Sequence, residues 1–187
     1  AALAALLPDA RIEILGLAAG SAQPDLGAIK AMRTLGANVE LLDDRIVVSS
    51  ATRLTGFDLD CSAFPDAALM LAIMASRCEG RSTLRGLRTL RVKETDRIAA
   101  LATELRQFGC EVEEGPDSLT IEPGIDSGAS VHVETYLDHR MAMAFAILGA
   151  VRGNVVIENP DCAAKSHPGF WAELGGFAGG SKTGDTS

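Results

Sequence analysis

The feature that most constrains the fold is an internal repeat with a period of 72 to 73 residues. The segment Leu35-Gly-Ala-Asn-Val-Glu40 is matched by Phe108-Gly-Cys-Glu-Val-Glu113, whose glycines are 109 − 36 = 73 positions apart. Each glycine follows an amphipathic pattern, so we expect it to end a helix in a left-handed conformation. Two short strand patterns follow each glycine, at 38–42 and 45–49 in one copy and at 111–114 and 118–122 in the other.

The repeat also includes two apolar segments. Residues 67–75 correspond to residues 140–149, and the aspartates that precede them, Asp66 and Asp138, are 138 − 66 = 72 positions apart. Both segments are apolar all round, which predicts helices that are buried on every side. At about ten residues they are too short to span a membrane. We therefore expect an α/β (α+β) fold with buried helices inside and sheets outside.

The repeat also predicts how the chain is organised. The unit is helix, strand, helix, strand, strand, and the 187 residues hold about two and a half copies. Residues 1–7 and 11–17 fit the template as a first copy whose helix is cut by the start of the sequence. We expect one globular domain over residues 1–174, which ends with a short helix at 168–174. Residues 175–187 are rich in glycine and are predicted to form a flexible tail.

Charge and composition argue against several classes of partner. The net charge of −8 argues against nucleic acid, and no apolar run approaches the roughly 20 residues of a membrane span. The apolar start has no basic residues before it, so we do not expect a signal peptide. The cysteines and histidines lack metal-ligand spacing, which predicts no metal site and buried thiols in a reducing compartment such as the cytoplasm: Cys61, Cys78, Cys110, Cys162, His132, His139 and His167.

A charged stretch stands at the start of another predicted helix. Lys93, Glu94, Asp96 and Arg97 fall within five positions, and an apolar helical pattern follows over residues 98–108. Such a cluster is either a solvated helix start or a site that holds an anion. A cation in the first helical turn opposes the helix dipole. A bound anion would reverse that penalty, because free backbone N–H groups and a guanidinium would share it.

The same feature recurs one repeat later, where Asp138 is the expected N-cap and Arg140 lies in the first turn. Asp66, which follows Pro65, is either an N-cap or a carboxylate poised as a general base. Two further residues also have ordinary structural interpretations. Glu94 fits a surface ion pair with its neighbours, and Lys165 fits a plain surface lysine.

These segments occur together in one known family. The sequence resembles the 5-enolpyruvylshikimate-3-phosphate synthases, or 3-phosphoshikimate 1-carboxyvinyltransferases, in four stretches that follow the family's order: 64–68, 91–98, 138–143 and 164–168. The resemblance implies an enolpyruvyl transferase-type fold with two domains of three repeated units each. Because family members are about twice this length, the chain resembles their C-terminal half.

The resemblance also implies an activity and its residues. The family's reaction transfers the enolpyruvyl group of phosphoenolpyruvate to the 5-hydroxyl of shikimate 3-phosphate and releases phosphate, in aromatic amino acid biosynthesis. It needs neither a metal nor an organic cofactor. The implied roles are a base that contacts the shikimate hydroxyls (Asp66), a catalytic substrate contact (Lys93), an acid-base partner (Glu94), phosphoenolpyruvate ligands (Arg97, Arg140 and Lys165) and a neighbour of that site (His139).

Some parts that the family uses are absent from this sequence. They are the N-terminal lysine, the glycine-rich phosphoenolpyruvate loop with its arginine, and the serine-rich segment that grips the shikimate phosphate. The implied partner is therefore the missing N-terminal domain, and the chain alone is expected to have little or no turnover. Two alternatives remain, namely a non-catalytic folded half and a relative that acts on UDP-N-acetylglucosamine.

Overall fold

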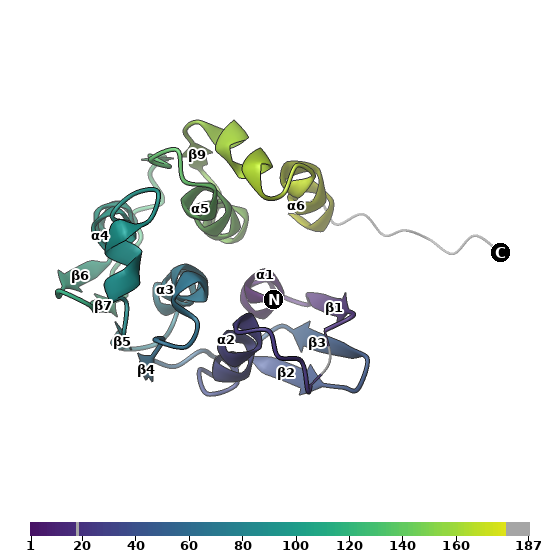
Figure 1. Cartoon of the computed structure of the whole chain (residues 1–187). Coiled ribbons are helices and arrows are strands. Elements are labelled where there is room, and N and C mark those ends of the chain that lie inside the picture. The colour runs from purple at the N-terminus through teal and green to yellow at the C-terminus, as the bar shows by residue number, and fades with distance from the viewer. Residues whose placement is uncertain (18, 179–187) are drawn as a thin grey trace.

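The order of helices and strands repeats along the chain in the computed structural model, which describes residues 1–17 and 19–178 (Figure 1). The first copy comprises α1 (Ala2–Leu6), β1 (Arg11–Leu15), α2 (Asp25–Met32), β2 (Asn38–Leu41) and β3 (Arg45–Ser49). The second comprises β4 (Asp58–Asp60), η1 (Pro65–Ala67), α3 (Ala68–Ala75), β5 (Ser82–Arg85), η2 (Arg88–Val92), α4 (Arg97–Gln107), β6 (Glu111–Glu114) and β7 (Leu119–Glu122). The third comprises β8 (Val131–Val133), α5 (His139–Arg152), β9 (Val155–Ile157), η3 (Pro160–Lys165) and α6 (Phe170–Ala178).

Two strands were not predicted from the sequence. β4 and β8 precede the apolar helices at equivalent positions, 131 − 58 = 73 residues apart, so the full unit begins with a strand. Each pairs in parallel with the strand that follows its helix, β4 with β5 and β8 with β9. With three residues each, they are too short to show the alternation that identifies a strand.

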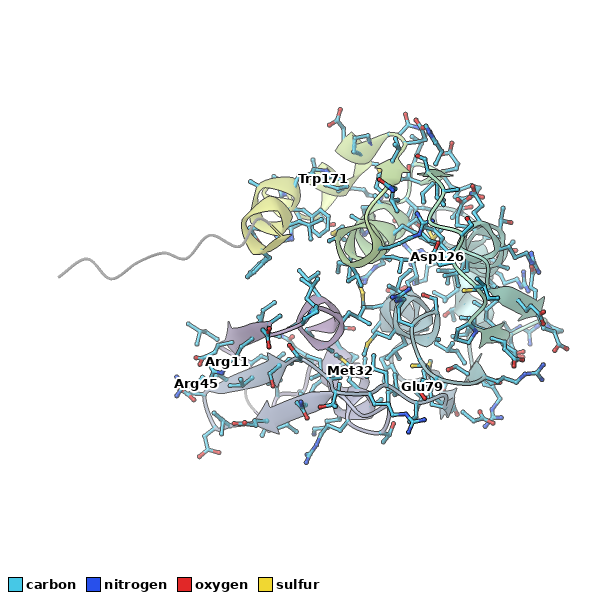
Figure 2. The ribbon with its side chains drawn as sticks, turned by 180° about the vertical axis from the view of Figure 1, so that it is seen from behind. Arg11, Met32, Arg45, Glu79, Asp126 and Trp171 are labelled. Atoms are coloured by element: carbon cyan, nitrogen blue, oxygen red, sulfur yellow. The ribbon has the colours of Figure 1, made fainter. Side chains whose placement is uncertain are left out.

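The sheets of the three copies lie on the outside of the molecule. They are β1-β3-β2, β4-β5-β7-β6 and β8-β9. In the first sheet, Ile46 and Val48 of the central strand are fully buried. Arg11 and Arg45 lie together on its outer side, where both pair with Glu13 (Figure 2). Exposed and half-buried residues alternate along β1, which gives this sheet one face toward the helices and one toward solvent, although Val47 of the central strand is also buried.

The helices α1, α3 and α5 occupy the middle of the molecule and contact one another (Figure 1). Seven of the eight residues of α3 are buried, as predicted, whereas only six of the fourteen residues of α5 are buried, all of them between Met141 and Leu148, so α5 is not buried on every side. The predicted arrangement of buried helices inside and sheets outside is thus confirmed. Among the described residues, no helix is both long and apolar enough to cross a membrane.

The two glycines that we expected to end helices both have positive φ values, +97° at Gly36 and +83° at Gly109. Gly109 directly follows the C-cap of α4, whereas α2 ends at Met32 and Gly36 closes the turn of residues 33–36 that follows it. The predicted helix 168–174 is found as α6 and extends to Ala178, so residues 175–178, which we expected in the tail, are helical. The rest of the predicted tail, 179–187, lies outside the described residues.

Three of the four cysteines are buried as expected. Cys61, Cys78 and Cys110 lie in the core, while Cys162 is partly exposed, and all four thiols are free. Burial raises the pKa of Cys61 and of Cys78 to about 12. These thiols are therefore poor nucleophiles, and we assign them to core packing.

Candidate functional site

The centre of the site is Arg97, the first residue of α4. Asp96 caps this helix by accepting a hydrogen bond from the backbone N–H of Ala99 at 3.1 Å. The side chain of Arg97 is only 2% exposed and is directed into the molecule. A guanidinium that is buried so completely requires anionic partners to offset its lost hydration.

Three carboxylates supply those partners. Asp138 accepts from Nε of Arg97 at 2.7 Å and from Nη2 at 3.2 Å. Asp66 accepts from Nη1 at 2.9 Å, and Glu94 accepts from Nη2 at 2.8 Å. Asp66 stands just before α3, Glu94 just before α4 and Asp138 just before α5, so the N-termini of three helices meet at one guanidinium. Carboxylates in this position also complement the positive ends of the helix dipoles.

The structure tests the N-cap prediction for Asp138 and decides between the two interpretations of Asp66. Asp138 is the N-cap of α5, as predicted, and its Oδ1 accepts from the backbone N–H of Arg140 at 2.8 Å. Asp66 is not a cap, because α3 begins after Ala67 and has no side-chain cap. The N-cap interpretation of Asp66 is therefore wrong, and its carboxylate is instead directed at the cations of the site.

Three more cations surround this buried centre. Nζ of Lys93 lies 3.3 Å from Oδ1 of Asp66, and Nη2 of Arg140 lies 3.7 Å from its Oδ2. Nζ of Lys165, in η3, lies 3.1 Å from Oε1 of Glu94. Lys165 is 64% exposed, whereas Arg97 lies at the base of the cluster. An anion that approaches from solvent therefore meets Lys165, Lys93 and Arg140 before it reaches Arg97.

Glu94 and His139 have clearly shifted pKa values. The backbone N–H of Glu94 itself and the ammonium of Lys165, helped by Arg97, lower the pKa of Glu94 to about 2. Burial lowers the pKa of His139, as do Arg140 and Arg97, while Asp138 and Glu94 act in the opposite direction. His139 is thus neutral at pH 7. Its Nδ1 is buried, lies 3.8 Å from Oε1 of Glu94 and has no hydrogen-bond partner among the described residues.

The cluster carries a local positive excess in an acidic chain. Four cations (Lys93, Arg97, Arg140 and Lys165) face three carboxylates (Asp66, Glu94 and Asp138), which gives 4 − 3 = +1 with His139 neutral. A cavity of about 260 Å³, with mostly apolar walls, opens beside Asp66 and Arg140. The described residues contain no group of three or more side chains suited to hold a metal ion. The arrangement is suited to bind an anion next to carboxylates that can move protons.

The seven residues singled out in the sequence, Asp66, Lys93, Glu94, Arg97, His139, Arg140 and Lys165, all belong to this one cluster. The sequence identified Asp138 only as a cap and missed its ion pair with Arg97, which is the most buried pair of the site. One signal was available, because an arginine at the start of a helix needs a carboxylate nearby.

The comparisons with known proteins agree with one another. A model of the family EPSP synthase (3-phosphoshikimate 1-carboxyvinyltransferase) matches residues 1–174. A 3-phosphoshikimate 1-carboxyvinyltransferase of Shewanella denitrificans is 40% identical over 163 residues, which cover 87% of this chain and 38% of the relative. A second 3-phosphoshikimate 1-carboxyvinyltransferase, from Pseudoalteromonas translucida, is 42% identical over 171 residues, which cover 91% of this chain and 40% of the relative. An EPSP synthase structure from Acinetobacter baumannii matches with a TM-score of 0.79 and 27% identity. The match covers 95% of this chain and 43% of the chain of that structure. The chain thus spans about two fifths of the length of these curated relatives.

Proposed function

The chain belongs to the EPSP synthase family, and we propose that it supplies one side of the active site of a 3-phosphoshikimate 1-carboxyvinyltransferase. The observation that carries the proposal is the convergence of three helix N-termini and three further cations around Arg97. Such a cluster suits a substrate that carries both a phosphate and a carboxylate. The proposed substrates are phosphoenolpyruvate and shikimate 3-phosphate, with neither a metal nor an organic cofactor.

The proposed reaction uses the cations and carboxylates of the cluster in different ways. Lys165, Arg140 and the Nη atoms of Arg97 hold phosphoenolpyruvate, with His139 beside it. Asp66 accepts the proton of the shikimate 5-hydroxyl as its oxygen bonds to C2 of phosphoenolpyruvate, and Lys93 contacts shikimate 3-phosphate. C3 gains a proton from an acid, for which Glu94 is the candidate. The tetrahedral intermediate then returns a proton from C3 to this acid-base group and loses phosphate.

Glu94 can serve as that acid only after its surroundings change. A pKa of about 2 means that the group is ionised at neutral pH while Lys165 and Arg97 hold it. If the substrate's anionic groups attract these two cations, Glu94 keeps the hydrogen bond from its own backbone N–H but loses the two cations that also lower its pKa, and the pKa rises. Binding of phosphoenolpyruvate would thus prepare Glu94 to carry a proton.

The charge balance supports the need for a second half of the site. Each substrate carries a phosphate and a carboxylate, whereas this cluster has an excess of only +1. The complementary part of the enzyme must therefore contribute further cations, and we propose that it is the missing N-terminal domain. We expect the chain alone to release little or no phosphate.

The test is to mix the chain with the part of the Shewanella denitrificans relative that it does not match, and to measure phosphate release from both substrates. We expect release from the mixture, little from either part, and a large loss in the Lys165→Gln mixture. Arg85→Gln, which changes an exposed pair with Asp58, is the matched control. If the mixture accepted UDP-N-acetylglucosamine in place of shikimate 3-phosphate, the substrate assignment would be wrong. If it released no phosphate with either, the non-catalytic alternative would hold.

A further inference from the structure

A second contact joins α4 to the turn that precedes α5, and the proposed reaction does not use it. Glu104 lies seven residues after Arg97, two helical turns along nearly the same face of α4. It is only 2% exposed. The hydroxyl of Tyr136 donates to its Oε1 at 2.8 Å, and the amide of Gln107 donates to its Oε2 at 2.6 Å.

The turn that carries Tyr136 has an unusual backbone. Tyr136 and Leu137 have φ values of +55° and +54°, a conformation that costs non-glycine residues free energy. Leu137 is 69% exposed, so its own burial does not compensate this cost. The strained pair immediately precedes Asp138 and therefore sets the direction in which α5 begins.

We propose that Glu104 and Tyr136 are positioning residues, which hold this turn so that Asp138, His139 and Arg140 face Arg97. Together with the ion pair of Arg97 and Asp138, their hydrogen bond fixes the turn to α4 at two points. The proposed positioning role rests on the geometry of the site. Only its consequence for catalysis rests on the proposed function.

The chemistry of the pair favours positioning over simple stabilisation. Burial raises the pKa of Glu104, and burial together with Glu104 raises the pKa of Tyr136 to about 12. Burying a carboxylate carries a desolvation cost that an apolar side chain of similar size avoids. A hydrogen bond, by contrast, fixes the direction of the tyrosine ring and hence of the turn.

The test follows His139 by NMR titration in the 187-residue chain, with its signal assigned from His132→Gln and His167→Gln. In Tyr136→Phe we expect the loosened turn to admit water to His139, whose pKa then rises toward its ordinary value. Ser50→Ala is the control, because it removes a side-chain hydrogen bond to the carbonyl of Leu7, far from the site. It should leave the His139 titration unchanged.

A double variant separates positioning from folding. Glu104→Leu with Tyr136→Phe replaces the polar pair by apolar groups and should keep the native circular dichroism, while the pKa of His139 still rises. An unchanged His139 titration in folded Tyr136→Phe and in the double variant would overturn the proposal. Because no substrate is present, this result is independent of whether the mixture with the complementary part releases phosphate.

Discussion

Asp138→Asn is the substitution that most directly probes the buried centre of the site. Asp138 is completely buried and accepts two hydrogen bonds from Arg97, which is nearly as buried. Asparagine keeps the shape of the side chain and can still cap α5. It loses the negative charge, and its amide group turns a donor toward a guanidinium that has only donors.

The size of the effect follows from this geometry. Removing one partner of a buried ion pair costs about 3 to 5 kcal/mol. Because Asp66 and Glu94 still accept from Arg97, we expect the lower end, about 3 kcal/mol of unfolding free energy. With a denaturant slope of about 2 kcal/mol per molar urea, the unfolding midpoint should fall by about 1.5 M.

Urea unfolding followed by circular dichroism measures this change. The matched control is Asp58→Asn, which breaks a pair with Arg85 at a similar distance of 2.7 Å, with both side chains more than half exposed. We expect less than about 1 kcal/mol for this surface pair. If the two substitutions shifted the midpoint equally, Arg97 and Asp138 would not form the buried centre described here.

Three further predictions concern the scaffold. Gly109→Ala should lower the free energy of unfolding, measured in urea, by more than about 1 kcal/mol, because the φ of Gly109 is positive and a Cβ would lie 2.6 Å from the carbonyl oxygen of Ile125. The control Gly175→Ala, in α6, should not lower it. Iodoacetamide should alkylate Cys162 and spare Cys61, as mass spectrometry of peptides can check; equal labelling would contradict the burial of Cys61. Arg152 lowers the pKa of Asp126 to about 2, so the ionised carboxylate stabilises the folded chain above the ordinary value of 3.8, and this contribution is lost as the pH falls toward 2. Asp126→Asn should therefore flatten the acid side of a stability-pH profile, and an unchanged slope would argue against the pair.

The sequence predicted the main elements because the repeat supplied each of them twice. The strands at 38–42 and 111–114 were identified with their helix-ending glycines, and the apolar helices were placed inside. The family resemblance, confirmed by the comparisons, then brought the separate motifs together. The contacts between these motifs, which lie far apart in the sequence, depend on how different helices pack against one another. The periodicity of residues along one helix gives no information about that packing.

What the sequence did not predict has identifiable physical causes. β4 and β8 have only three residues each, so their parallel pairing rather than their pattern makes them strands. The left-handed pair Tyr136 and Leu137 carries no glycine signal, and its support comes from Glu104, 32 positions before Tyr136. Asp66 matched the pattern of a cap, but the neighbouring cations determine its direction.

The most direct test of the central proposal is the affinity of phosphoenolpyruvate for the chain mixed with the complementary part of the relative. Calorimetric titration would compare the wild-type chain with Lys165→Gln, Arg140→Gln and the control Arg85→Gln. We expect each site substitution to weaken binding by about tenfold or more, equivalent to at least about 1.4 kcal/mol, and the control to bind like the wild type. If both site variants bound phosphoenolpyruvate as tightly as the control, the cluster around Arg97 would not be its binding site.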